Sequence, residues 1–359
     1  MPAAPLDRVA RLGCARHALV IGGLLALALG IAVARNWGAV SRALGDASAM
    51  AEGADEARAL ETPDDLLDWI RQHPDRGALV VWDLEADSVV MTVGRADAAR
   101  PAVSLPLVAP VLDLLGRPDT VAIPPSALRT LPGIERRSAD STAQSVAAVA
   151  RRALRGDRAA GDAVLHLTSD AARLGSGGGA VPLDGLFLTW AQAARADALD
   201  GVLTRGRIDS AAWALSRRLR TDDAFREATE ADLAAHGLGL SLGDQRRAAA
   251  ATFPRLRADT LARWLGHIAR GRDPLAMSFL SVATDPATDS LRARGGERLG
   301  VFGGGFPGLQ STAGILTRAD GGGRVVVLLL HGLPHAVFYH LAQTGLDVGL
   351  VLDQLGLDE

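Results

Sequence analysis

Lysine is absent from this chain of 359 residues, so all 38 of its basic residues are arginine. A guanidinium group stays protonated at any physiological pH, and arginine therefore cannot replace lysine as a proton acceptor. The sequence excludes every mechanism in which a lysine amine activates a nucleophile. The arginine bias itself is most simply explained by a GC-rich genome.

Cysteine and aromatic residues are also scarce. The single cysteine, Cys14, excludes an intrachain disulfide. Aromatic residues make up 4% of the chain and hydrophobic residues 48%, so small aliphatic side chains must fill most of the core. The net charge is −3 and no basic tail or stripe is present, which gives a nucleic-acid partner no electrostatic support.

An uncharged run covers residues 18–34, and three arginines precede it. Its length is near the lower limit for a helix that crosses a bilayer. We therefore expect residues 1–37 to form a cytoplasmic start and a membrane anchor. The main domain would then lie outside the cytoplasmic membrane of a bacterium. The alternative is a removable signal peptide cleaved near Ala34, which would release the domain.

Residues 38–61 are rich in Ala, Glu, Asp and Arg, and we expect them to form a stalk or linker. A single domain should follow over residues 62–359. Its predicted elements are a helix from Thr62 to Pro74, strands over 78–84 and 88–93, helices over 104–272, strands over 299–302, 311–317 and 325–331, and a helix over 336–355. This order predicts an α+β fold, with an antiparallel sheet built from both chain ends and a helical lobe inserted between them.

Three junctions in this order carry short motifs. Ser104 follows the first hairpin and opens a helix, and Leu107 lies three residues further on. A turn between two helices contains Gly156-Asp157-Arg158. A late strand contains Phe302 followed by Gly303-Gly304-Gly305. Together with the element order, these segments resemble the S-x-x-K, S-D-N and K-T-G motifs of the serine β-lactamase and penicillin-binding protein (DD-peptidase) superfamily. The resemblance covers roughly residues 62–355.

The resemblance implies a defined chemistry. In that superfamily the first serine is the nucleophile, and the lysine one helical turn later can take its proton. The serine of the second motif relays protons, and its asparagine holds the substrate. The second lysine attracts the substrate carboxylate, and the strand after it presents a backbone N–H to the oxyanion.

Most of these groups are replaced in this chain. Ser104 remains as a remnant nucleophile, but the two lysine positions hold Leu107 and Phe302. In the second motif Gly156 replaces the serine, Asp157 matches, and Arg158 replaces the asparagine. A GC-rich genome would replace lysine with arginine, but these two positions hold leucine and phenylalanine. The loss of lysine at them is therefore functional. The resemblance therefore implies a degenerate, inactive relative of the family in which Ser104 and the cleft glycines, Gly303, Gly304 and Gly305, survive as the remnant of an oxyanion hole.

Simpler interpretations exist for each residue. Ser104 can be an N-cap for the following helix, and the glycines can form a bulge or loop. Asp157 and Asp162 can be capping or solvated acids, and Asp184 is the only carboxylate in the loop over 175–188.

A metal or cofactor site is not expected. The late histidines His331, His335 and His340 are not spaced to share a helical face, and no cysteine or glutamate joins them. The glycine-rich stretch over 175–179 lacks the lysine of a phosphate-binding loop.

Three functions remain open. The first is a non-catalytic domain of the cell envelope that binds a cell-wall peptide or an envelope protein. The second is an atypical serine hydrolase acylated at Ser104, with a non-lysine base such as a histidine. The third is a structural or assembly protein for which the membrane anchor matters most. The sequence favours the first and does not separate it from the third.

Overall fold

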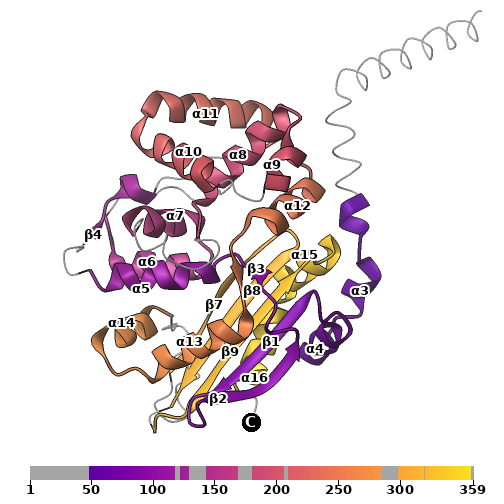
Figure 1. Cartoon of the computed structure of the whole chain (residues 1–359), viewed down its shortest axis with the longest axis vertical. Coiled ribbons are helices and arrows are strands. Elements are labelled where there is room, and N and C mark those ends of the chain that lie inside the picture. The colour runs from indigo at the N-terminus through magenta and orange to yellow at the C-terminus, as the bar shows by residue number, and fades with distance from the viewer. Residues whose placement is uncertain are drawn as a thin grey trace, which may run out of the picture. The chain divides into compact units, whose positions relative to one another are not determined.

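A computed structural model describes residues 48–117, 122–128, 143–168, 180–205, 209–283, 298–318 and 320–356 (Figure 1). The expected membrane segment over 18–34 lies outside these ranges. Within them, no helix combines the length and the apolar character that crossing a membrane requires.

Nine strands are present among the described residues: β1 (Gly77–Asp83), β2 (Ser88–Gly94), β3 (Arg100–Pro101), β4 (Ala122–Ile123), β5 (Gln144–Ser145), β6 (Arg255–Leu256), β7 (Arg298–Phe306), β8 (Leu309–Thr317) and β9 (Gly323–His331). The helices of the two chain ends are α3 (Ala54–Arg58), α4 (Pro63–Gln72), α15 (His335–Thr344) and α16 (Leu346–Gln354). Those between them are α5 (Val108–Leu115), α6 (Val146–Leu154), α7 (Arg158–Leu167), α8 (Leu183–Arg195), α9 (Leu199–Arg205), α10 (Asp209–Thr221), α11 (Asp223–His236), α12 (Leu242–Thr252), α13 (Ala258–Arg270) and α14 (Pro274–Ala283). Two short 3₁₀ turns, η1 (Leu105–Leu107) and η2 (Pro125–Leu128), complete the described part.

The main sheet has five antiparallel strands in the order β2-β1-β9-β8-β7. Its first two strands come from the start of the domain and its last three from the end, with α5 to α14 between them in the sequence (Figure 1). The predicted α+β class and the sheet built from both chain ends are therefore confirmed. We refer to α5–α12 as the helical lobe.

The sheet separates two hydrophobic cores because successive side chains of a strand point to opposite faces. In β1, Ala78 and Val80 contribute to the core shared with α13 and the helical lobe. Leu79 and Val81 contribute to the other core, under α4, α15 and α16. All four side chains are at most 2% exposed, so β1 is central in both cores.

The two edges of the sheet differ. At one edge, a bulge in β2 leaves Val90 without a partner in β1, and its side chain is 53% exposed. A bulge of this kind makes an edge strand a poor template for pairing with another chain. The other edge is β7, and it lies against the helical lobe.

Two predicted elements have different bounds in the structure. The predicted final helix over 336–355 is wrong as a single helix, because Gly345 adopts φ +69° and divides it into α15 and α16. The strand predicted over 299–302 continues through the three glycines to Phe306. The glycines are therefore part of the sheet and do not form a loop.

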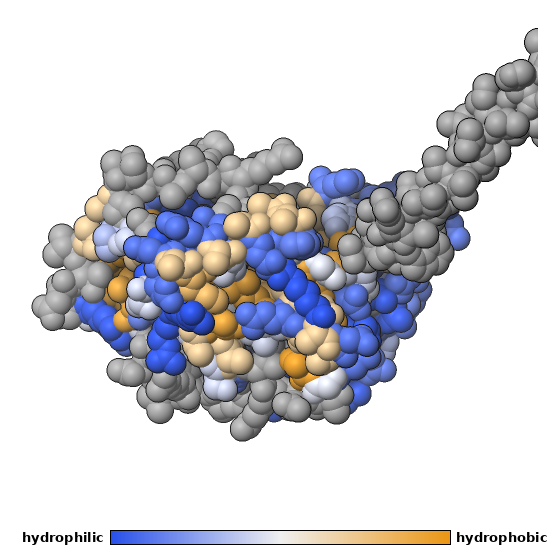
Figure 2. Space-filling model, turned by 90° about the horizontal axis from the view of Figure 1, so that it is seen from above, coloured by the Kyte–Doolittle hydropathy of each residue, from blue (hydrophilic) through white to orange (hydrophobic). Residues whose placement is uncertain are grey.

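The side of the helical lobe formed by α10 and α11 is viewed in Figure 2, where hydrophobic residues lie between hydrophilic ones. Alanines account for the exposed apolar positions of these two helices, including Ala211, Ala214, Ala228 and Ala235. Alanine favours helix and exposes little apolar area, so these positions reflect helix propensity.

Four aromatic side chains join β7 to the helical lobe. Phe306, the last residue of β7, lies 5.5 Å from the ring of Phe187, 6.0 Å from Trp190 and 5.2 Å from Phe253 between ring centroids. Phe187 and Trp190 belong to α8, and Phe253 follows α12. In a chain with few aromatic residues, this cluster concentrates the strongest apolar contacts at one junction between the sheet and the lobe.

Replacing Phe306 with alanine should therefore loosen this junction. We expect Phe306→Ala to lower the free energy of unfolding by about 2–4 kcal/mol, measured by urea denaturation. The exposed bulge provides the control, since Val90→Ala should change the free energy by less than about 0.5 kcal/mol. Equal effects of the two substitutions would contradict a special role for the cluster.

Candidate functional site

The segment that leads into Ser104 is fixed from several sides. Arg100 is 1% exposed, and its guanidinium donates hydrogen bonds to the backbone carbonyls of Pro74, Gly77, Arg95 and Ala98. β3 pairs with β6, and the next residue, Ala102, donates its N–H to the carbonyl of Pro254 at 2.9 Å.

The sheet also binds this segment directly. The N–H of Val103 donates to the hydroxyl of Ser311 on β8 at 3.3 Å. Ser311 is fully buried, so this bond connects the loop before Ser104 to the interior of the sheet. Sequence reasoning missed both Arg100 and Ser311, because a buried arginine and a strand serine carry no local signal of such partners.

Ser104 lies at the start of η1 and is 3% exposed. The interpretation of Ser104 as a side-chain N-cap is wrong. The residue has helical backbone angles (φ −91°, ψ −24°), and its hydroxyl caps no backbone N–H. Within the described ranges, the Ser104 hydroxyl takes part in no hydrogen bond. One turn later, the side chain at the first lysine position is the buried Leu107.

The Ser104 hydroxyl is covered by glycines from two directions. A Cβ atom placed on Gly304 of β7 would lie 2.4 Å from the Ser104 Oγ, and one placed on Gly156 would lie 3.3 Å from it. The two glycines also contact each other, since the Gly304 Cα is 3.5 Å from a Cβ built on Gly156. We call this contact of Ser104, Gly156, Gly303 and Gly304 the seam. It brings the backbone of β7 against the turn between α6 and α7.

Only glycine fits at two positions of the seam. Gly156, between α6 and α7, has φ +80°, a conformation that side chains disfavour. Gly303 has φ +153°, and a Cβ there would lie 2.1 Å from the carbonyl oxygen of Ser311. The glycine replacing the serine of the second motif therefore has a structural role, because it allows the backbones to approach closely.

Phe302, at the position where the resemblance would place the second lysine, is a core residue. Its side chain is 3% exposed and packs edge-to-face on Phe279 of α14, at 6.1 Å between centroids. Gly305 is the next residue after the seam. A Cβ on Gly305 would point to Gln310 and Phe338, away from Ser104. The oxyanion role of Ser104 and Gly305 stays a prediction.

A small cavity of about 40 Å³ lies beside Ser104. This volume holds about three water molecules and is far below the roughly 150 Å³ that accommodates benzene. Its lining is mainly apolar and comprises Ala102, Val103, Ser104, Leu107, Gly156, Asp157, Arg158, Gly161, Asp162, Leu165, Ala180, Val181, Leu183, Leu186, Phe253 and Pro254. Among the described residues, this lining contains no histidine, and its only carboxylates are Asp157 and Asp162.

The charged groups of the second motif have structural partners. Asp157 caps α7 by accepting the N–H of Ala160 at 3.1 Å, and its second oxygen pairs with Arg152 at 2.8 Å. Its interpretation as a capping acid is therefore confirmed. Arg158 is 5% exposed and lies 2.9 Å from a carboxylate oxygen of Asp184, an ion pair without the alignment of a linear hydrogen bond.

Asp162 is the second carboxylate of the cavity and is 1% exposed. Its two oxygens accept the N–H groups of Leu183 at 2.7 Å and Asp184 at 3.0 Å, at the start of α8. Burial, and then the charge of Asp184, raise the pKa of Asp162 to about 7, against the lowering effects of the Asp184 N–H and of Arg220. The capping interpretation holds, but Asp162 is buried and not solvated.

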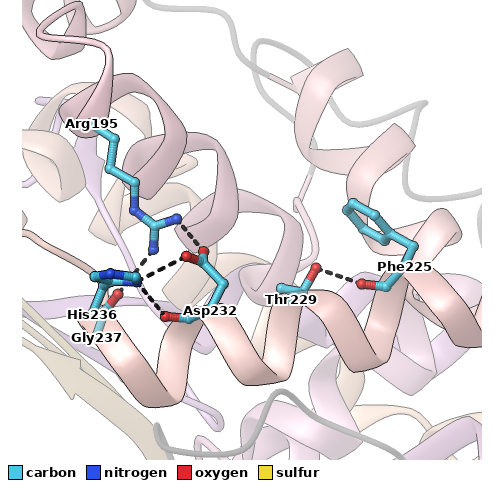
Figure 3. A network of polar contacts seen from close by, with 6 residues as sticks. All are labelled: Arg195, Phe225, Thr229, Asp232, His236 and Gly237. Atoms are coloured by element: carbon cyan, nitrogen blue, oxygen red, sulfur yellow. Dashed lines mark hydrogen bonds and ion pairs between the residues drawn. The ribbon is translucent and has the colours of Figure 1, made fainter.

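Histidines elsewhere serve the helical lobe. His166 Nε2 lies 2.7 Å from the hydroxyl of Ser216, but burial, followed by the charges of Arg220 and Arg217, lowers the pKa of His166 to about 3. Ser216 is 2% exposed, so this Ser–His pair combines a weak base with an inaccessible hydroxyl. Figure 3 shows His236 of α11 bonded to Asp232, which also pairs with Arg195 of α8.

The late histidines also have structural surroundings. His335 is fully buried and His340 Nε2 lies 2.6 Å from the carbonyl of Leu60. Burial, and secondarily Arg100, lower the pKa of His331. Over the described ranges, no three His, Cys, Asp or Glu side chains are placed to bind a metal ion together.

Comparison with known proteins gives structural likenesses only. No protein-family model matches the chain, and no curated protein matches it. Among solved structures, it is similar to a β-lactamase from Sphaerobacter thermophilus at 14% identity and a TM-score of 0.43, over 86% of this chain and 97% of that one.

Two other β-lactamases give comparable values. The enzyme from Chitinophaga pinensis has 13% identity and a TM-score of 0.43, over 82% of this chain and 97% of that one. The enzyme from Desulfarculus baarsii has 16% identity and a TM-score of 0.42, over 82% and 97%. TM-scores below 0.5 at such identities do not by themselves establish the fold, family or activity of this chain.

The seam predicts a specific coupling between two residues. Gly304→Ala should destabilise the protein by about 1–3 kcal/mol, because its methyl group would collide with the Ser104 Oγ. Ser104→Ala should relieve most of this cost in the double variant, since the Ser104 Cβ lies at an ordinary 3.5 Å. Denaturant unfolding of the four proteins in the cycle gives the coupling energy. Gly243→Ala, in an open position of α12, is the control. Additive effects at 304 and 104 would show that the seam is not closed.

The raised pKa of Asp162 predicts a pH-dependent stability. Between the unfolded value of 3.8 and about 7, the folded state binds a proton that the unfolded state has lost. Folding is therefore favoured at low pH, and this contribution falls as pH rises through that window, by at most about 1.4 kcal/mol per pH unit. The stability of the wild type relative to Asp162→Asn should decrease from pH 5 to pH 8. A difference that does not change with pH would contradict this assignment.

Proposed function

We propose that this chain is a degenerate relative of the serine β-lactamases and penicillin-binding proteins, and that its domain has a non-catalytic binding or scaffold role in the cell envelope. Residues 18–34 would anchor it in the cytoplasmic membrane with the domain outside, or cleavage near Ala34 would release it. Its partner would be a cell-wall peptide or an envelope protein. The motif positions and the sheet built from both chain ends support this relationship.

The state of Ser104 is the observation that carries the proposal. A serine hydroxyl becomes a nucleophile only when a base lies within hydrogen-bond reach. Ser104 has no such partner in the described part of the chain, and Leu107 occupies the position of the proton acceptor. Gly304 and Gly156 cover the hydroxyl from two directions, and the cavity beside it has a volume of only about 40 Å³.

The neighbouring polar groups support the same conclusion. Arg158 is paired with Asp184, and Asp157 caps α7 and pairs with Arg152. A ligand would have to break these buried contacts before it could use them, at a cost of several kcal/mol. These side chains stabilise the closed lobe and are not available for substrate binding.

One observation favours a second candidate, an atypical serine hydrolase acylated at Ser104. Asp162 lines the same cavity as Ser104, and its pKa of about 7 suits a general base at neutral pH. However, both of its oxygens already accept backbone N–H groups. A base role would require Asp162 to leave the start of α8.

Covalent labelling separates the two candidates. We expect neither a fluorescent penicillin nor a fluorophosphonate to modify Ser104 in the purified full-length chain, because the hydroxyl is not activated and not accessible. Gel fluorescence and peptide mass spectrometry measure the labelling, and Ser104→Ala provides the background. A penicillin adduct on Ser104 would overturn the non-catalytic proposal. A fluorophosphonate adduct that Asp162→Asn abolishes would establish the second candidate.

A further inference from the structure

The chain before α4 packs on the domain over residues 49–60, a segment we call the strap. Ala57 and Leu60 are buried at 7% and 2% exposure in the core under α15 and α16. His340 of α15 lies within hydrogen-bond distance of the Leu60 carbonyl, and Glu56 accepts a hydrogen bond from the Trp69 indole at 3.1 Å. This part of the expected stalk therefore contacts the domain.

Glu52 in the strap is bonded to both halves of the domain. Its carboxylate pairs with Arg246 of α12 at 2.7 Å, which connects it to the helical lobe. Its backbone carbonyl accepts the N–H of Ala336 of α15 at 3.2 Å, which connects it to the helices on the sheet. The next residue, Gly53, has φ +78° and approaches Pro334 so closely that a Cβ would lie 2.3 Å away.

Arg246 and helix α15, which both bond to Glu52, also contact the hairpin of β7 and β8. The aliphatic part of Arg246 covers the turn at Gly308, where a Cβ would lie 2.5 Å from the Arg246 Cγ. On α15, Phe338 packs against Gly305, 3.0 Å from the position of a Cβ there. Gly304, which precedes Gly305 in β7, covers the Ser104 hydroxyl. The strap is therefore connected to the β7–β8 hairpin by two routes, one through Arg246 and Gly308 and the other through Phe338 and Gly305.

The attachment of the strap at Glu52 is weak compared with the cores. The side chain of Glu52 is 47% exposed and that of Arg246 is 28% exposed, so solvent screens the pair. α3 has only five residues and contributes one buried alanine. A segment with so few buried contacts opens far more readily than the sheet.

We propose that the strap is a releasable tie between the helical lobe and the sheet, and that it helps to keep β7 closed over Ser104. Release of residues 49–60 lets the β7–β8 hairpin separate from the Gly156 turn and exposes the cleft to a ligand. This inference rests on the proposed function, in which the cleft binds without reacting. According to this inference, attachment or release of residues 49–60 controls whether a ligand can reach the cleft.

Thiol labelling at position 104 tests the strap. The full-length chain with Cys14→Ser and Ser104→Cys carries one thiol, whose reaction rate with a maleimide under native conditions reports how often the seam opens. Adding Glu52→Ala should raise this rate about two- to fivefold, the range for a partly exposed ion pair, without lowering the thermal midpoint. Arg246→Ala should have the same effect. The matched control is Asp200→Ala, which removes an exposed partner of Arg247 on the same helix.

Two results would overturn the proposal: a rate unchanged by Glu52→Ala, or an equal increase with Asp200→Ala. If the Ser104→Cys chain does not fold, backbone hydrogen exchange replaces the thiol measurement. Exchange at residues 303–306 is then compared between the wild type and the Glu52→Ala variant. Faster exchange supports the strap and unchanged exchange excludes it. Penicillin labelling of the wild type tests the proposed function independently, so the two failures can be told apart.

Discussion

The arrangement of this protein depends on the close packing of β7 against the helical lobe. Phe306 anchors the end of the strand among Phe187, Trp190 and Phe253, and the glycines before it let the backbone contact Gly156 and Ser104. Both features are needed for close packing. Without the aromatic contacts a gap would remain beside β7, and with a side chain at Gly304 the strand would collide with Ser104. These contacts thereby cover the Ser104 hydroxyl.

The groups that survive near Ser104 are explained by this closure. Asp162 caps α8, Arg158 and Asp184 neutralise each other in the interior, and Phe302 fills the core against Phe279. Each of these groups therefore contributes to the stability of the fold.

The sequence predicted the antiparallel sheet and its construction from both chain ends, because the continuous apolar runs of β1 and β9 and the N-cap at Thr62 are local signals. It also identified the residues around Ser104, through the spacing of three motifs. It did not predict that Gly304 covers the Ser104 hydroxyl, or that Arg100 and Ser311 fix the loop before it. These are contacts between segments far apart in the chain, which no local pattern records. The split of the last helix at Gly345 was missed because an isolated glycine also occurs inside helices.

A crystal structure of the protein grown with a large excess of a boronic acid tests the central claim most directly, because boron bonds reversibly to an accessible, activated serine oxygen. The account predicts an unmodified Ser104 with Gly304 and Gly156 in contact above it. Boron bonded to the Ser104 Oγ, with β7 displaced from the Gly156 turn, would contradict it.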